Sequence, residues 1–239
     1  MRRSGQLRLA VITLMALLYI PLSSQAEEGD AHGHKHHGKH GMGSKSIEEY
    51  IAMFEDPSRA EWQKPEQVVE ALELKAGDAV ADIGAGSGYF SVLFAKKVGD
   101  RGRVYATDVE QGMVDYIKKR MEKEGLKNIT PVLCEPDNPG LAEKSVDLLF
   151  ICDTWHHIPE RPAYLQKIAK VLKPGGRLAI VDFKKEPTPE GPPMRMRLSR
   201  EEVVQEITKA GYALSREFDF LPYQYFLVFE VKGEGPGPR

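Results

Sequence analysis

A glycine-rich turn that joins an apolar run to a helical pattern constrains this chain more than any other feature. The run at residues 79–83 is apolar except for Asp82, and residues 89–97 have the pattern of a helix. Three glycines lie between them at alternate positions, Gly84, Gly86 and Gly88. Glycine lets the backbone approach a ligand closely, and the helix N-terminus beyond it offers free N–H groups. This order of elements predicts a ligand-binding turn of an α/β protein.

The spacing of these glycines indicates the chemistry of the ligand. A dinucleotide site has the pattern G-x-G-x-x-G, with a pyrophosphate at the helix N-terminus. Here the third glycine comes one residue early, and the bulky Tyr89 stands where the pattern needs glycine. Asp82, just before the turn, would repel a phosphate and suits a ligand that carries an ammonium group. The turn therefore disfavours a nicotinamide oxidoreductase.

The rest of the chain alternates predicted strands with predicted helices, as a parallel sheet requires. Strands are expected at residues 79–83, 103–107, 128–134, 145–152 and 177–183. Helices are expected at residues 46–54, 65–74, 89–98, 111–124 and 161–172, with turns at 99–102 and 173–176. Ser199 and Glu202 form a capping-box pattern that starts a further helix. Residues 213–220 and 224–232 then predict an antiparallel pair of strands.

Three segments, in the correct order, resemble the class I S-adenosylmethionine-dependent methyltransferases. They are the glycine turn at residues 82–88, Asp108 at the end of the second strand, and residues 171–178. The resemblance spans residues 46–232 and implies a Rossmann-like α/β fold. Its seven-stranded, mostly parallel sheet would have helices on both faces and a C-terminal antiparallel hairpin. It also implies S-adenosylmethionine as cofactor and a small-molecule acceptor, which the sequence does not identify.

The same resemblance implies the residues that hold the methyl donor. The glycines would pass its methionine part, and Asp82 would lie near its amino group. Asp108 would hold the ribose, since a carboxylate accepts hydrogen bonds from two hydroxyls at once; it is also a candidate cap of the next helix. Asp137 or Glu135 would meet the adenine amino group, with a plain loop as the alternative. The expected cofactor-binding residues are Asp82, Gly84, Ala85, Gly86, Gly88, Asp108, Val109, Asp137 and Asp153.

The segment after the fourth strand holds the candidate catalytic residues, Asp153, His156 and His157. Ligands of open α/β sheets bind beyond the carboxyl ends of the strands, so this loop should lie over the donor. A histidine with a near-neutral pKa suits removal of a proton from an acceptor hydroxyl or amine. The alternative is structural, because transfer from a sulfonium can require only approach and alignment.

Two other segments are candidates for contacts with ligand or acceptor. Arg59 and Trp62 precede the first strand, where helices cover the pocket in this family; the alternative for Trp62 is packing on the sheet edge. Residues 184–197 form a proline-rich, basic loop that should cover the acceptor side. Its cationic or flexible side chains are candidates for an anionic acceptor, with a solvated loop as the alternative: Met194, Arg195 and Arg197.

The two ends of the chain lie outside this domain. Residues 1–26 resemble a secretory signal, with a positive start, a short apolar run and small residues before a cut after Ala26; an uncleaved membrane anchor is the alternative. This predicts a periplasmic, secreted or membrane-anchored protein. Residues 27–45 read as a disordered linker, and 233–239 as a flexible tail. The linker is either a spacer or a weak metal site formed by His32, His34, His36, His37 and His40.

Charge and cysteine content limit the other functions and covalent features that this chain can have. The formal net charge of −2 gives no indication of nucleic-acid binding. Cys134 and Cys152 lie in apolar runs on strands expected to be interior, which favours two buried thiols over a disulfide. Two functions outside methyl transfer stay open: a non-catalytic nucleoside sensor, and an exported metal-binding protein on a methyltransferase scaffold.

Overall fold

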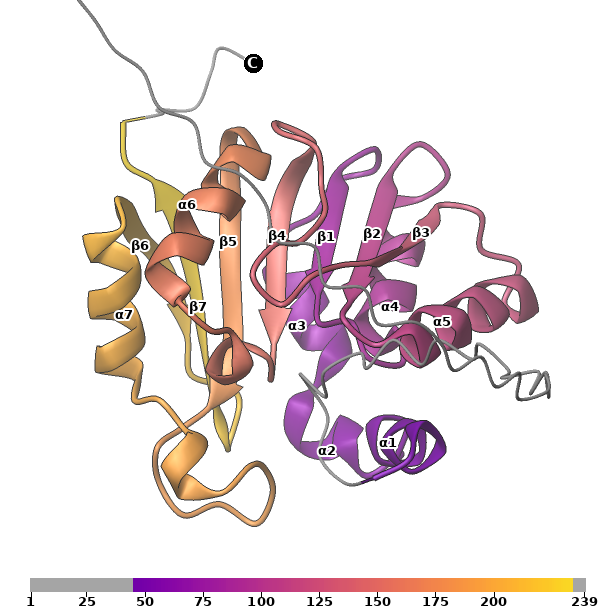
Figure 1. Cartoon of the computed structure of the whole chain (residues 1–239), viewed down its shortest axis with the longest axis horizontal. Helices are drawn as coiled ribbons and strands as arrows, with labels where there is room; N and C mark the ends of the chain where they lie inside the picture. Colours follow the sequence, from indigo (N-terminus) through magenta and orange to yellow (C-terminus); the bar gives the residue numbers. More distant parts are fainter. Residues whose placement is uncertain (1–44, 234–239) are drawn as a thin grey trace, which may run out of the picture. The chain divides into compact units, whose positions relative to one another are not determined.

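The computed structural model describes residues 45–233 of the chain. The signal or anchor, the histidine cluster and most of the tail predicted above lie outside these residues. Within them, seven strands form one sheet in the order β3-β2-β1-β4-β5-β7-β6 (Figure 1). The strands are β1 Ala79–Ile83, β2 Arg103–Asp108, β3 Ile129–Leu133, β4 Val146–Cys152, β5 Leu172–Phe183, β6 Tyr212–Phe218 and β7 Gln224–Val231.

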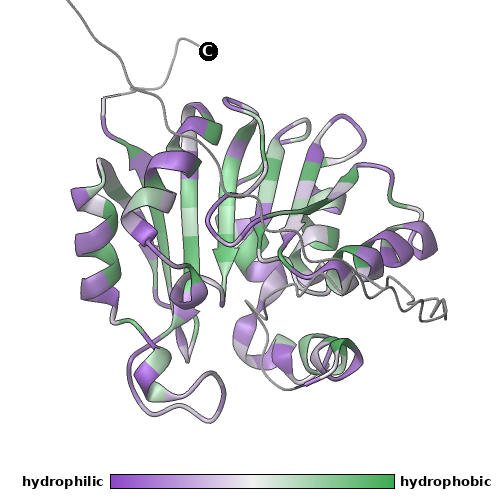
Figure 2. Cartoon of the chain, in the orientation of Figure 1, coloured by the Kyte–Doolittle hydropathy of each residue, from purple (hydrophilic) through white to green (hydrophobic). Residues whose placement is uncertain are grey.

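Helices cover both faces of the sheet. They are α1 Ile47–Phe54, α2 Arg59–Gln63, α3 Pro65–Ala71, α4 Tyr89–Val98, α5 Gln111–Lys123, α6 Arg161–Val171 and α7 Arg200–Lys209, with short 3-10 turns η1 Trp155–His157 and η2 Met194–Met196. Apolar side chains of α3, α4 and α5 pack on one face, and those of α6 and α7 on the other. Figure 2 shows the result, a largely hydrophobic sheet under helices with hydrophilic outer faces. Within residues 45–233, no helix is long and apolar enough to cross a membrane.

Strand pairing brings the chemistry-bearing loops to one edge of the sheet. Strand β1 pairs in parallel with both β2 and β4, and β4 pairs in parallel with β5. The chain builds the sheet outward from β1 to β3, then returns to β4 on the other side of β1. The loops after β1 and β4 therefore leave the sheet at the point where the strand order reverses, which is where open α/β sheets bind ligands.

The predicted seven-stranded sheet, its parallel core and its C-terminal antiparallel pair are confirmed. Three details differ. Strand β5 begins at Leu172, so the segment predicted as a turn at residues 173–176 is part of the strand, where the pairing with β4 shifts register. The short helix α2 was not predicted. Cys134 follows β3, the edge strand, and is half-buried, whereas Cys152 is buried; both are free thiols.

Candidate active site

The glycine turn adopts the backbone conformation that its composition predicted. Gly84, Gly86 and Gly88 have φ angles of 68°, 55° and 76°, in the left-handed region that favours glycine. The N–H groups of Gly84 and Ala85 both donate to the carbonyl of Thr107 on β2, each at 2.9 Å. The turn is thereby held against the end of β2, and Gly88 is the N-cap of α4.

Asp108 lies next to this turn. Its Oδ2 accepts a hydrogen bond from the Gly86 N–H at 2.8 Å, and its Oδ1 accepts one from the Glu110 N–H at 2.9 Å. The side chain is buried, and burial raises its pKa above the usual value. Each carboxylate oxygen keeps a further lone pair, so the group can still accept hydrogen bonds from a ligand. The N-cap of α5 is Glu110, so Asp108 is not its cap.

Asp82 is a second buried acid at the same edge. Its Oδ2 accepts a hydrogen bond from the Ser91 hydroxyl at 2.6 Å. Burial raises the pKa of Asp82 to about 7, and the nearby Asp108 charge adds to the rise. No side chain within residues 45–233 forms an ion pair with either acid. Two buried carboxyl groups that form no ion pair with the described residues fit a ligand that brings an ammonium group and hydroxyls.

Asp153 is held by side chains from two separate elements, α2 and β7. Its carboxylate accepts from Gln63 Nε2 of α2 at 2.9 Å and from Gln224 Nε2 of β7 at 2.5 Å, and a nitrogen of Arg59, also in α2, lies 3.5 Å away. Asp153 itself has a φ of 52°, which is strained for a residue with a side chain. Burial raises its pKa to about 6. Gln63 and Gln224 were not predicted, because carboxamides have no motif spacing to reveal them.

His156 is paired with a carboxylate that the sequence analysis also missed. Its Nδ1 lies 2.9 Å from Asp182 Oδ1, and both side chains are only 3% exposed. Burial lowers the pKa of His156, but the hydrogen bond and charge of Asp182 outweigh burial and raise it overall. The ring of His157 lies 4.2 Å from that of His156, centroid to centroid, and His157 is exposed. The two histidines therefore have different surroundings.

The helices before β1 pack over the glycine turn. A Cβ added at Gly86 would lie 3.0 Å from the ring of Phe54 in α1. Glu55, which ends α1, accepts from the Ser87 hydroxyl at 2.5 Å and pairs with Arg120 of α5. Helix α1 therefore covers the glycine turn, and its role as a cover for the ligand stays a prediction.

Two predicted contact residues have packing roles. The Trp62 ring lies 5.6 Å from that of Phe183 and 6.1 Å from that of Tyr223, centroid to centroid, so Trp62 packs on the end of β5. Arg197 is buried rather than solvated. Its guanidinium donates to four backbone carbonyls of its own loop and to the Thr188 hydroxyl. The expectation that Arg197 reaches an anionic acceptor is corrected, because neutral acceptors take its donors; Met194 and Arg195 are exposed.

The remaining predicted residues are spread more widely. Ala85 is buried in the turn, and Val109 is half-buried beside Asp108. Asp137 is exposed, and its carboxylate pairs with Lys167 of α6 at 2.5 Å. Glu135 is also exposed. Neither acid has a side-chain contact with the glycine turn among the described residues, so the adenine contact stays a prediction.

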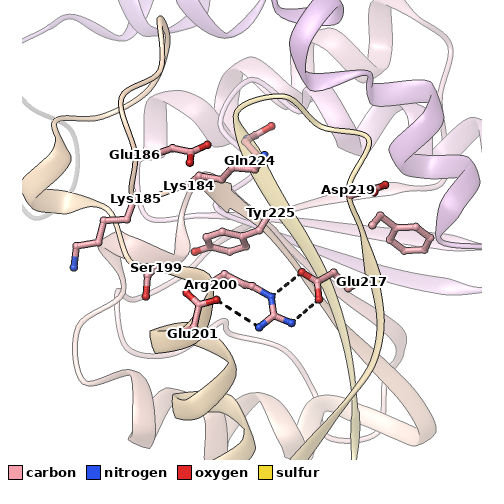
Figure 3. Close-up of a pocket in the computed structure, with 11 residues that line it drawn as sticks. Lys184, Lys185, Glu186, Ser199, Arg200, Glu201, Glu217, Asp219, Gln224 and Tyr225 are labelled. Carbon is pink, nitrogen blue, oxygen red and sulfur yellow. Dashed lines mark hydrogen bonds and ion pairs between the residues drawn. The ribbon is translucent and has the colours of Figure 1, made fainter.

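A cavity of about 300 Å³ lies beside this edge, between the loop after β5, the start of α7 and the β6–β7 pair (Figure 3). Tyr225 lines it, and the Tyr225 hydroxyl is buried with no hydrogen-bond partner among residues 45–233. Charged side chains of both signs surround the opening, and Arg200 pairs with Glu217 there. Gln224, next to Tyr225, links the cavity to Asp153.

Comparisons with known proteins identify the family. The sequence profile of a family described as a methyltransferase domain matches residues 80–176. The chain is 34% identical to an S-adenosylmethionine-dependent methyltransferase from Aquifex aeolicus of known crystal structure; the match has a TM-score of 0.73 and covers 77% of this chain and 98% of that one. The chain therefore belongs to the class I S-adenosylmethionine-dependent methyltransferases. Its cofactor is S-adenosylmethionine.

Curated relatives share a shorter region. The chain is 32% identical over 119 residues to the methyltransferase GfsG of Streptomyces halstedii, a match that covers 49% of this chain and 42% of GfsG. It is 32% identical over 114 residues to the aklanonic acid methyltransferase DauC of Streptomyces sp. strain C5, covering 48% of this chain and 52% of DauC. The matched region thus spans about half the length of these relatives.

Proposed function

We propose that this protein transfers a methyl group from S-adenosylmethionine to a small-molecule acceptor at the carboxyl edge of its sheet. The observation that carries the proposal is the 2.8 Å hydrogen bond between Asp108 and the Gly86 N–H. It places the acid at the end of β2 against the glycine turn at the end of β1. One ligand that carries both ribose hydroxyls and an amino acid part fits across these two loops.

The residues of this edge have distinct parts in the proposal. Asp108 accepts hydrogen bonds from the ribose hydroxyls, and the turn from Gly84 to Gly88 lies alongside the amino acid part of the donor. Asp82 lies near the ligand ammonium group. When bound, the cofactor supplies an electrophilic methyl carbon on a sulfonium sulfur. The chain covers the site with α1 and α2, which excludes water, and Asp153 and His156 face the acceptor side.

Calorimetry on the full chain tests the proposal. We expect S-adenosylmethionine to bind and NADH not to bind. Asp108→Asn should weaken donor binding by about 1.5–3 kcal/mol, the worth of a hydrogen bond to a charged group. Asp115→Asn, on the exposed side of α5, is the matched control and should leave donor affinity unchanged. Absence of donor binding at high micromolar concentration would refute the proposed function.

We also propose that residues 1–26 direct export and are removed after Ala26. The support is the sequence alone: a positive start, a short apolar run and small residues before the cut. The mass of the protein purified from the envelope fraction of its own cells tests this. A mature chain that starts at Glu27 supports export, and a retained Met1 overturns cleavage in favour of an anchor.

A further inference from the structure

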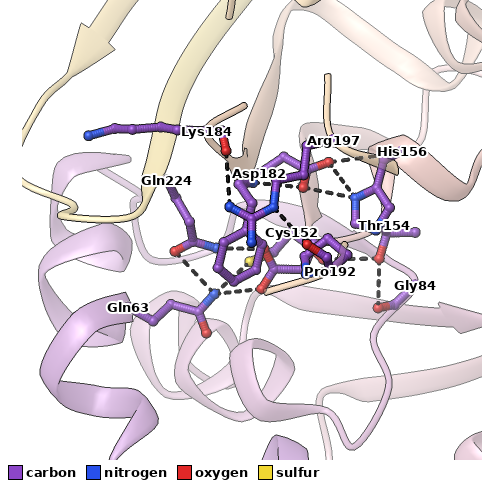
Figure 4. Close-up of polar contacts among 12 residues, drawn as sticks. Gln63, Gly84, Cys152, Thr154, His156, Asp182, Lys184, Pro192, Arg197 and Gln224 are labelled. Atoms are coloured by element: carbon purple, nitrogen blue, oxygen red, sulfur yellow. Dashed lines mark hydrogen bonds and ion pairs between the residues drawn. The ribbon is translucent and has the colours of Figure 1, made fainter. Parts of the chain in front are cut away.

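The pair formed by His156 and Asp182 is built from two neighbouring strands. Asp182 is the second-last residue of β5, and His156 lies in η1, just after β4 (Figure 4). Asp182 accepts from the His156 backbone N–H at 3.2 Å as well as facing Nδ1 at 2.9 Å. Its Oδ1 also accepts from the Phe183 N–H at 2.8 Å. Three nitrogens thus contact the carboxylate: the backbone nitrogens of His156 and Phe183, and His156 Nδ1. Rotation of the imidazole would break the contacts of Nδ1 with both carboxylate oxygens.

This geometry selects one tautomer of the imidazole. An ionised Asp182 can only accept hydrogen bonds, so the neutral ring carries its proton on Nδ1. Nε2 then keeps a lone pair. No described residue donates a hydrogen bond to Nε2, although the ring is 3% exposed. A nitrogen lone pair without a partner, beyond the carboxyl ends of the strands, is placed to accept a proton.

We propose that His156 is the general base of the methyl transfer, that Asp182 is the residue that positions it, and that the acceptor is a weakly acidic ring hydroxyl, phenolic or enolic. This inference rests on the proposed function. As the acceptor oxygen bonds to the methyl carbon, the carbon–sulfur bond breaks and its electron pair stays on sulfur. The hydroxyl proton passes to His156 Nε2, and Asp182 remains ionised beside the resulting imidazolium. Solvent then takes the proton.

Charges around His156 support a proton-accepting role. Asp182 faces it from β5, and Asp153 lies at the end of β4. His157 is its neighbour in η1, and Arg197 is the basic residue of the loop after β5 whose charge acts on His156. The two carboxylates outnumber the one guanidinium, whose donors are already taken by backbone carbonyls. A positive charge that develops on His156 is therefore stabilised.

The other acceptor classes need something that this edge does not offer. A carboxylate acceptor has no proton to lose and requires a cation, but Arg59 pairs with Asp153 and Arg197 is occupied by its own loop. A neutral amine attacks without prior loss of a proton, so it gains little from a base. A hydroxyl is a weak nucleophile until its proton leaves. Trp62 and Tyr223, which pack around the end of β5, are only half-buried, so their exposed ring surface suits contact with a flat ring.

The first test reads the histidine directly and needs neither donor nor acceptor. We expect ¹⁵N NMR of the full chain, labelled at histidine and recorded at a pH above the raised pKa of His156, to show the neutral ring as the Nδ1–H tautomer, with the signal assigned by its loss in His156→Gln. An Nε2–H tautomer would leave no lone pair at that atom and would overturn the proposal. Asp182→Asn should lower the pKa of His156, whereas Asp115→Asn should leave it in place. An unchanged pKa in Asp182→Asn overturns the positioning role.

The second test uses a series of phenols of graded acidity as acceptor probes, with aniline as the amine control and labelled S-adenosylmethionine. We expect oxygen-methylated products, and a loss of about 10²–10⁴-fold in kcat for His156→Gln, the range for general-base catalysis. The loss should be greatest for the least acidic phenol, with donor affinity by calorimetry unchanged. Transfer only to aniline, methyl groups on carbon, or no transfer to any phenol would overturn the proposal. Failure of the wild type to bind the donor would instead refute the proposed function.

Discussion

Replacing Asp82 with asparagine should stabilise the donor-free protein at neutral to alkaline pH and lower its affinity for the donor. Asp82 is 3% exposed, forms no ion pair with any described residue and takes its hydrogen bonds from Ser91; the burial raises its pKa by more than the Arg59 charge lowers it. Ionising it in the folded state therefore costs free energy that the unfolded chain does not lose. An asparagine oxygen can accept the same Ser91 bond without a charge to bury, so packing should be preserved.

The size and sign of the effect follow from the pKa of Asp82. The rise from 3.8 to about 7 corresponds to about 4 kcal/mol of unfolding free energy at high pH. Below the unfolded value of 3.8, both states are protonated and nothing is lost. As pH rises, the unfolded chain ionises first and the wild type loses stability relative to the variant. The loss is complete once pH exceeds about 7, and the difference is constant above it.

Urea unfolding of wild type and Asp82→Asn across a pH series measures this difference. The two stabilities should converge at acidic pH and separate to about 4 kcal/mol above neutrality, with the variant more stable. Asp115→Asn is a control with the opposite expected effect. Hydrogen bonds to the Asp115 carboxylate lower its pKa, so this variant should be less stable than the wild type at neutral pH, and the difference should disappear at acidic pH. Parallel wild-type and Asp82→Asn curves would refute the reasoning, since they would mean that folding does not change the protonation of Asp82.

Donor binding supplies an independent check on the same group. A ligand ammonium group stabilises the ionised carboxylate, so at about pH 6 the wild type should release up to one proton on binding. Calorimetry in buffers of different ionisation enthalpy counts that proton. Asp82→Asn should release none from this position and bind more weakly. Proton release that is equal in both proteins would show that another group is responsible.

Three further changes test other contacts. Gly84→Ala puts a methyl group 2.5 Å from the Thr154 side chain at a φ of 68°, so urea unfolding should show a loss of about 1–3 kcal/mol and calorimetry weaker donor binding. Gln224→Leu removes the 2.5 Å hydrogen bond to Asp153, which should cost about 1–3 kcal/mol and raise the pKa of Asp153, measured by urea unfolding and carboxyl NMR titration. Arg197→Met removes the bonds that hold residues 184–197 together, so limited proteolysis should cut that loop faster than in the wild type.

The fold was largely predictable because its signals are local. Apolar runs, glycine turns and helix periodicity each act over a few residues, and they predicted the seven strands. The boundary of β5 was missed for the same reason. Lys173 to Gly176 carries turn-forming residues, and none of them pairs with β4: the pairing passes from Leu172–Val146 directly to Arg177–Leu148. The segment therefore bulges out of a strand that is paired on both sides of it, and this pairing, which depends on distant residues, places the start of β5 at Leu172.

The site was predictable only where its residues belong to a motif. The glycine turn and Asp108 follow known spacings, but their donor contacts still await measurement. Gln63 and Gln224 reach Asp153 across 90 and 71 residues of sequence, and Asp182 reaches His156 across 26. Nothing in the local pattern indicates such partners. Burial likewise determines the role of Arg197, whose guanidinium donates hydrogen bonds to its own loop.

The charge balance of this edge discriminates between ligands more strongly than the glycine spacing does. Three acids, the buried Asp82 and Asp108 and the half-buried Asp153, lie around the ends of β1, β2 and β4, and desolvation raises the pKa of each. Within residues 45–233, Arg59 is the one basic side chain paired with any of them. A pyrophosphate would add negative charge to this group, whereas a sulfonium with an ammonium group supplies the positive charge that the edge lacks. Donor affinity should therefore fall as pH drops through the pKa values of these acids, which calorimetry from about pH 5 to pH 8 can measure; affinity independent of pH would show that the acids stay out of donor binding.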